Sequence, residues 1–157
     1  QGYWNDPEAT NDTFTDDGWL RTGDLGSFDS LGNLHVKGRS KSVIVLANGE
    51  NVYPEAIEHK LNSYPFVVET LVVENRGMLE AWVYPDYDFI DGETQGQSRQ
   101  QRHEYIFTAL DEMRVEVNEH LALASRLSRV LERREPFIKT ATHKIKRYLY
   151  TADTMTA

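Results

Sequence analysis

The sequence predicts an α+β domain of mixed α/β character, in which helices pack on a small, antiparallel-rich sheet. Two runs rich in residues that favour strands, β-branched in 67–73 and largely apolar and aromatic in 78–84, flank a short polar turn and predict a β-hairpin. A later segment carries apolar residues at intervals of 4, 3, 4 and 4, the spacing of a helix with one buried face. These residues are Ile106, Leu110, Met113, Val117 and Leu121.

Shorter segments complete the predicted order of elements. Residues 27–36 predict a second hairpin, because apolar residues flank a Ser-Leu-Gly-Asn turn. Residues 19–25 and 43–46 are expected to form short strands, the second of them buried. Pro54 suits the first turn of a helix, since its missing N–H would have no partner there. The polar, glycine-containing stretch 86–100 is expected to be a surface loop.

The composition excludes several classes of site. Of the 157 residues, 39% are hydrophobic and 27% charged, which is ordinary for a soluble globular protein. Cysteine is absent, so the chain has no disulfides, thiolate metal sites or cysteine nucleophiles. The longest unbroken aliphatic stretch, residues 43–47, is far shorter than the ~20 apolar residues that cross a bilayer. Because the chain begins with Gln1 rather than methionine, we expect a piece of a longer protein. The absence of cysteine is compatible with a reducing cytoplasm, and we expect the protein to be cytoplasmic or associated with a membrane surface.

Charge is distributed unevenly along the chain. The net charge of −8 argues against a nucleic-acid partner. Residues 126–147 nevertheless carry eight basic side chains and only two acidic ones. An anionic group is therefore expected to meet the C-terminal end. The five histidines show no metal-ligand spacing, so no metal site is predicted within the chain.

Three separated segments carry a family signal. They are 18–25 (GWLRTGDL), 38–58 (GRSKSVIV continuing to NGENVYPEAIE) and 136–147 (PFIKTATHKIKR). In this order they resemble the adenylate-forming, AMP-forming enzymes, a family that includes acyl-CoA synthetases, luciferases and the adenylation domains of peptide synthetases. The amino-acid sequences of the second and third segments resemble the long-chain fatty acid–CoA ligase branch most.

The resemblance implies a domain organisation and a reaction. Residues 1–38 would be the trailing edge of a large N-terminal nucleotide-binding domain, 39–41 a hinge, and 42–157 a mobile C-terminal lid. The full enzyme would use ATP and Mg²⁺ to convert a fatty acid into an acyl-adenylate, and CoA would then take the acyl group with release of AMP. The phosphate loop and the Mg²⁺ ligands are expected in the missing N-terminal domain, so the isolated fragment is predicted to be inactive.

Three of the implied site residues lie around the expected hinge. Asp24 matches the family's ribose-binding aspartate, and a carboxylate suits a vicinal diol because it accepts two hydrogen bonds. Arg39 matches an arginine that also contacts the ribose, and Lys41 occupies the hinge position. The plainer alternatives are an aspartate that bonds its own turn and an ordinary pair of solvated charges.

The other two implied residues lie in loops. Gly49 matches the loop that lines the CoA tunnel, and its alternative is a plain turn before the helix. Lys144 matches the catalytic lysine, a mobile cation that would neutralise charge at phosphorus. Here the sequence departs from the family, because His143 stands where glycine usually precedes that lysine. The alternative for Lys144 is a basic tail that binds polyanions or acidic lipid.

Two other functions remain open at this point. A related adenylating enzyme passes its acyl group to a carrier protein instead of CoA. In a different class, the chain would be a non-catalytic interaction domain whose basic end binds anionic partners. The acyl chain length has no signal here, because the acyl pocket belongs to the missing domain.

Overall fold

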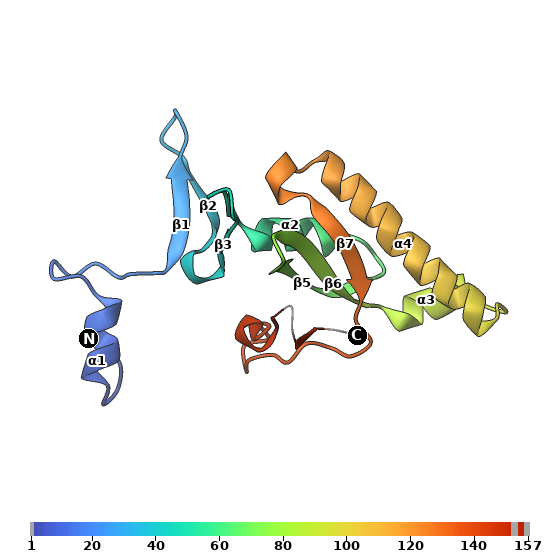
Figure 1. Cartoon of the computed structure of the whole chain (residues 1–157). Coiled ribbons are helices and arrows are strands. Elements are labelled where there is room, and N and C mark those ends of the chain that lie inside the picture. Colours follow the sequence, from blue (N-terminus) through green and yellow to red (C-terminus); the bar gives the residue numbers. More distant parts are fainter. Residues whose placement is uncertain (1, 152–153, 156–157) are drawn as a thin grey trace. The chain divides into compact units, whose positions relative to one another are not determined.

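A computed structural model describes residues 2–151, 154 and 155, and it divides the chain into two units, Gln1–Val43 (unit 1) and Ile44–Ala157 (unit 2). Unit 1 contains a short helix, a β-hairpin and one 3-10 turn (Figure 1). Their bounds are α1 Pro7–Thr13, β1 Asp24–Phe28, β2 Leu34–Arg39 and η1 Ser40–Ser42. Residues 39–41, the predicted hinge, thus lie within unit 1, two residues before the division between the units.

The hairpin predicted at residues 27–36 is present, but the strand predicted at 19–25 is wrong. The extended ladder starts only at Asp24, and Leu20 forms a single isolated bridge with Phe14. Gly23 explains the late start, because its φ of 74° lies in the left-handed region and interrupts an extended backbone.

Unit 2 is an α+β domain, as predicted. Among its described residues it contains ten strands, α-helices and 3-10 turns. In chain order they are β3 Ile44–Val45, β4 Asn51–Val52, α2 Pro54–Leu61, β5 Val67–Asn75, β6 Met78–Pro85, α3 Tyr87–Glu93, α4 Arg99–Glu119, η2 Leu123–Ser125, β7 Leu127–Glu132 and η3 Arg147–Leu149. The main sheet has the order β5-β6-β7. β5 and β6 are antiparallel, and β7 runs parallel to β6.

The β5–β6 hairpin is closed by a tight two-residue turn. Arg76 and Gly77 both take positive φ, 52° and 81°, which is the conformation of the hairpin turn that matches the twist of the strands. The parallel strand β7 needs a long crossover, and α3 and α4 provide it. Ser98 caps α4 in a capping box with Gln101.

The two faces of the sheet are covered by different layers (Figure 1). Alternate residues of each strand point to opposite faces. One face packs against the apolar sides of α2, α3 and α4. The buried residues of this larger core are Val52, Ile57, Leu61, Val72, Leu79, Ala81, Val83, Ile90, Ile106, Leu110, Met113, Val117 and Leu127.

The opposite face packs against the irregular C-terminal segment, drawn in red in Figure 1. The buried residues of this second cluster are Leu71, Trp82, Phe137 and Met155, and Ile145 and Tyr150 pack at its edge. The segment therefore lies on the sheet as a third layer, although little of it is regular secondary structure.

Two further expectations need correction. The stretch 86–100, expected to be a loop, contains α3: Asp86 caps the helix by accepting from the N–H groups of Asp88 and Phe89, and Ile90 is buried in the core. The strand expected at 43–46 is reduced to Ile44–Val45, and Val45 is 66% exposed. It pairs only with β4, outside the main sheet, so one side of it stays open.

Candidate active site

Asp24 and Arg39 meet at one end of the unit 1 hairpin. They are cross-strand partners in the β1–β2 register, and Arg39 Nε lies 3.0 Å from Asp24 Oδ1. Arg39 Nη1 also donates to the carbonyl of Thr22 at 2.9 Å. Both side chains are about half exposed, and a carboxylate has roughly four acceptor positions. The Asp24 carboxylate can therefore still accept hydrogen bonds from a ligand hydroxyl, and its ribose-binding role stays a prediction.

Lys41 lies in the short turn η1 and is exposed. Within residues 2–151, 154 and 155 its ammonium group forms no ion pair. Nothing in its contacts tests the hinge role, which stays a prediction.

Gly49 closes the short loop between β3 and β4. Its N–H donates to the Leu46 carbonyl at 2.8 Å, and the Leu46 N–H donates to the Glu50 carbonyl at 3.0 Å. Its φ is 82°, and a Cβ added here would meet no atom within 4 Å. The backbone conformation alone thus accounts for glycine at this position, and the CoA-tunnel role stays a prediction.

Lys144 follows a hairpin turn of the same construction. The Thr140 N–H donates to the Lys144 carbonyl at 2.8 Å, and the His143 N–H donates to the Thr140 carbonyl at 3.0 Å. The Lys144 N–H donates in turn to Thr140 Oγ1 at 3.2 Å. Lys144 is exposed and lies outside the core, and its Nζ forms no ion pair with any described residue. Its backbone is therefore fixed while its charge stays free to meet a ligand.

One loop geometry occurs four times in the described chain, at residues 15–19, 29–33, 46–50 and 140–144. In each, the first residue pairs with the fifth, and the fourth donates back to the first and takes a positive φ. The fourth residue is Gly18 in the first loop, Gly32 in the second, Gly49 in the third and His143 in the fourth, where φ is 60°. A left-handed residue at this place favours glycine, so His143 holds the same turn at some conformational cost.

The five predicted residues fall into two groups. Asp24, Arg39 and Lys41 lie in unit 1, whereas Gly49 and Lys144 lie on separate loops of unit 2. Within the described residues, no group of three or more histidine, cysteine or acidic side chains is placed to hold a metal ion. Nor, across that same part of the chain, is any helix both long and apolar enough to span a bilayer.

Comparison with known families gives the identity of the domain. Residues 41–153 match the family model described as the AMP-binding enzyme C-terminal domain. The chain belongs to this family. The matched range includes Lys41, Gly49 and Lys144.

Sequence relatives of this AMP-binding enzyme C-terminal domain are acyl-CoA ligases. The long-chain-fatty-acid–CoA ligase FadD15 of Mycobacterium tuberculosis is 38% identical over 99 residues, which cover 62% of this chain and 16% of the relative. FadD13 of the same species, also a long-chain-fatty-acid–CoA ligase, is 51% identical over 71 residues, 45% of this chain and 14% of the relative. The sulfoacetate–CoA ligase of Cupriavidus necator is 44% identical over 72 residues, 46% of this chain and 14% of the relative. The matched part of the chain thus spans only about a sixth of these relatives or less.

Solved structures of adenylating enzymes share the fold. The adenylation domain of the carboxylate reductase from Mycobacterium chelonae aligns with a TM-score of 0.73 at 25% identity, covering 94% of this chain and 23% of that one. The O-succinylbenzoate coenzyme A synthetase of Bacillus subtilis, solved with AMP, aligns with a TM-score of 0.67 at 26% identity, covering 94% and 27%.

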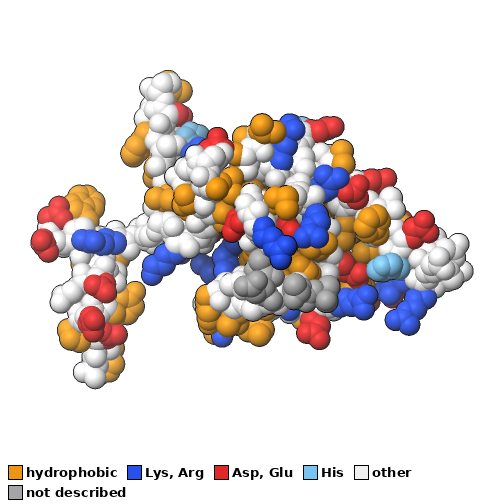
Figure 2. Space-filling view, viewed as in Figure 1, with side chains coloured by type: hydrophobic (Ala, Val, Ile, Leu, Met, Phe, Trp, Pro, Cys, Tyr) orange, Lys and Arg blue, Asp and Glu red, His pale blue; other side chains and the backbone are white. Residues whose placement is uncertain are grey.

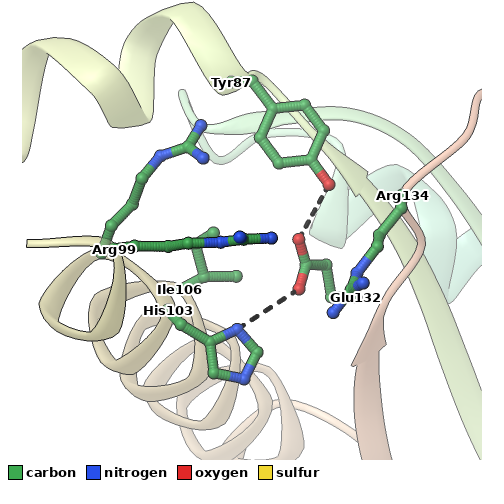
Figure 3. Close-up of a pocket in the computed structure, with 7 residues that line it drawn as sticks. Tyr87, Arg99, His103, Ile106, Glu132 and Arg134 are labelled. Carbon is green, nitrogen blue, oxygen red and sulfur yellow. Dashed lines mark hydrogen bonds and ion pairs between the residues drawn. The ribbon is translucent and has the colours of Figure 1, made fainter.

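The AMP-binding enzyme C-terminal domain also contains a polar pocket that sequence reasoning missed (Figure 3). Its volume is about 350 Å³, and Tyr87 and His103 both point toward Glu132 within it. The Tyr87 hydroxyl donates to Glu132 Oε1 at 2.8 Å, and His103 Nδ1 lies 4.0 Å from Glu132 Oε2. Burial, together with the adjacent carboxylate, raises the pKa of Tyr87. No sequence signal links Tyr87 to Glu132, 45 residues later, so only the fold reveals the pair.

Substitution of His143 tests the turn that precedes Lys144. His143→Gly should change the free energy of unfolding by less than about 1 kcal/mol, because relief of the left-handed strain is offset by a more flexible unfolded chain. His143→Val should shift the turn, since a β-branched residue strongly disfavours positive φ. In urea unfolding of the chain we expect the glycine variant to stay near wild type and the valine variant to lose about 1–3 kcal/mol. Equal free energies of unfolding for both variants would contradict this reading.

Proposed function

We propose that this chain is the C-terminal portion of a fatty acyl-CoA synthetase, acting as a mobile lid on a larger N-terminal nucleotide-binding domain. The observation that carries the proposal is Lys144: an exposed lysine, at the position that matches the family's catalytic lysine, follows a hydrogen-bonded turn on a packed segment. The names of the sequence relatives support a carboxylic acid and CoA as substrates.

In the first step a fatty acid carboxylate attacks the α-phosphorus of ATP. A bond forms between a carboxylate oxygen and phosphorus, and the bond to the leaving pyrophosphate breaks. Negative charge accumulates on the phosphoryl oxygens in the transition state, and the Lys144 ammonium group neutralises it there more than in the ground state. Asp24 holds the ribose hydroxyls. Arg39 orients the Asp24 carboxylate through the 3.0 Å contact between Arg39 Nε and Asp24 Oδ1.

In the second step the lid rotates about Lys41 and presents the Gly49 loop in place of the Lys144 turn. The CoA thiolate attacks the acyl carbon, the bond between that carbon and the phosphate oxygen breaks, and AMP leaves. A single site thus serves both half-reactions, and the motion of the lid separates them.

The exposed apolar surface of unit 1 indicates an interface with a large domain that is missing from this chain. None of its described residues is fully buried, and several bulky apolar side chains lie open, as Figure 2 shows on its helix and hairpin. Trp4 is 98% exposed, Leu31 85% and Phe28 73%. Apolar surface of this kind usually marks an interface, and the N-terminal domain of the same enzyme is the occupant we propose.

A carrier protein in place of CoA is the second candidate acceptor. The solved structures do not select the acceptor, because the adenylation domain of a carboxylate reductase and the coenzyme A synthetase share this fold alike, with TM-scores of 0.73 and 0.67. The sequence relatives favour CoA, because their names are those of CoA ligases.

The test uses the full-length enzyme that contains this chain. With a fatty acid, ATP and Mg²⁺ we expect acid-dependent release of pyrophosphate, followed by AMP and a thioester when CoA is added. Thioester formation on a holo-carrier protein but not on CoA would select the second candidate. Absence of acid-dependent pyrophosphate release with any carboxylic acid would overturn both.

The isolated chain should bind ATP only weakly, since the phosphate loop is expected in the missing N-terminal domain. Isothermal titration calorimetry of the chain with ATP measures this, and tight binding would contradict it.

A further inference from the structure

The turn that carries Lys144 belongs to a segment with little regular structure. Between β7 and Thr151, the described regular structure is the single bridge Lys139–Ile145 and the turn η3. Apolar contacts of Phe137, Ile145 and Tyr150 place the segment on the sheet. Such contacts are not directional, so they do not by themselves fix the turn to within an ångström.

Glu69 holds the chain that enters the turn. It is a residue of β5 and is only 8% exposed. Its Oε2 accepts from the Phe137 N–H at 2.9 Å, and its Oε1 forms an ion pair with Lys139 Nζ. One buried carboxylate therefore fixes both the backbone and a side chain of the segment that leads to Lys144.

Glu58 holds the chain that leaves the turn. It is a residue of α2, also 8% exposed, and its Oε1 accepts from the Val72 N–H on the free edge of β5 at 2.7 Å. Its Oε2 forms an ion pair with Arg147, three residues after Lys144. Burial raises the pKa of Glu58, and the charge of Arg147 acts in the opposite direction. Desolvating a buried ion pair can cost as much free energy as the pair gains, so stability alone does not account for a glutamate at this position.

We propose that Glu69 and Glu58 are positioning residues, which clamp the two ends of the Lys144 turn and act on adenylation through that lysine. The inference rests on the proposed function. A lysine side chain has several rotatable bonds, so its ammonium group reaches a phosphoryl oxygen reliably only from a fixed backbone. A displacement of about 1 Å can lower a rate by as much as 10²-fold.

The same sheet supplies a matched control. Glu80, a residue of β6, is 2% exposed and forms an ion pair with Arg129 and a hydrogen bond with Asn75. Its described partners lie outside the segment 136–150. A purely structural role for buried carboxylates predicts that the same substitution at Glu58, Glu69 and Glu80 has similar consequences.

The experiment compares Glu69→Gln, Glu58→Gln and Glu80→Gln in the full-length enzyme, with Lys144→Ala as the reference. Adenylation is measured as fatty-acid-dependent exchange between ATP and labelled pyrophosphate. The thioester step is measured separately, by mixing synthetic acyl-adenylate with CoA. We expect the Glu69 and Glu58 variants to lose about 10- to 100-fold in kcat for adenylation, with little change in KM for ATP and in the thioester step. The Glu80 variant should stay close to wild type in both.

Each outcome bears on a distinct claim. A full adenylation rate for Lys144→Ala would overturn the proposed function itself. If Lys144→Ala is impaired but the Glu69 and Glu58 variants behave like the Glu80 variant, or lose both half-reactions equally, only the positioning inference fails. Should a glutamine variant unfold, Lys139→Met or Arg147→Met removes the cationic partner of the same ion pair instead. The same selective loss of adenylation is then required.

Discussion

Replacing Lys144 with alanine is expected to lower acid-dependent pyrophosphate release by ~10²–10³-fold in the full-length enzyme, the usual effect of removing one group that stabilises transition-state charge. The side chain is exposed and forms no ion pair among the described residues, so its removal should leave the fold intact. The loss should appear in kcat rather than in KM for ATP, because the ammonium group acts on charge that develops only during the reaction. Stopped assays with saturating ATP and fatty acid measure it directly.

Lys146→Ala provides the control for charge alone. The substitution removes one positive charge from the same basic segment, two residues away from Lys144. The backbone N–H of Lys146 donates to the Ile138 carbonyl, and alanine keeps this hydrogen bond. If the basic end acted only as a diffuse field for any polyanion, both substitutions would weaken the reaction alike, and added salt would reproduce the loss. A large and salt-insensitive loss confined to Lys144 is the result that the catalytic reading requires.

The sequence predicts the fold well wherever a pattern is local and periodic. The β5–β6 hairpin and the buried stripe of α4 from Ile106 to Val117 follow directly from spacing and turn chemistry. α3 was missed because a polar composition hides a seven-residue helix with one buried residue, Ile90. The parallel pairing of β7 with β6 depends on a long crossover and has no local signal.

The candidate site divides in the same way. The turns at Gly49 and Lys144 could be located from short motifs, because each is closed by hydrogen bonds within five residues. The contacts that hold the Lys144 turn in place could not. Glu69 meets Phe137 across 68 residues and Glu58 meets Arg147 across 89, and an isolated glutamate carries no pattern that names its partner.

Phe137→Ala is expected to reduce the free energy of unfolding of this chain by about 3–5 kcal/mol, out of the 5–15 kcal/mol typical of a domain. Phe137 is 3% exposed and packs with Leu71 and Trp82 on the sheet face opposite the helices. Its ring also meets Tyr150 edge-on at 5.1 Å and lies 4.9 Å from the Arg133 guanidinium group. Truncation therefore leaves a cavity at the centre of the second cluster and removes two aromatic contacts at once.

Phe107→Ala is the matched control, because it deletes the same side chain from α4 at a position that is 72% exposed. Its effect on urea unfolding of the chain should stay within about 0.5 kcal/mol. A comparably small effect of Phe137→Ala would mean that the C-terminal segment is not packed on the sheet in solution. In that case Glu69 and Glu58 would have no fixed chain to hold, and the Lys144 turn would reach its phosphoryl group only after ordering on the nucleotide itself.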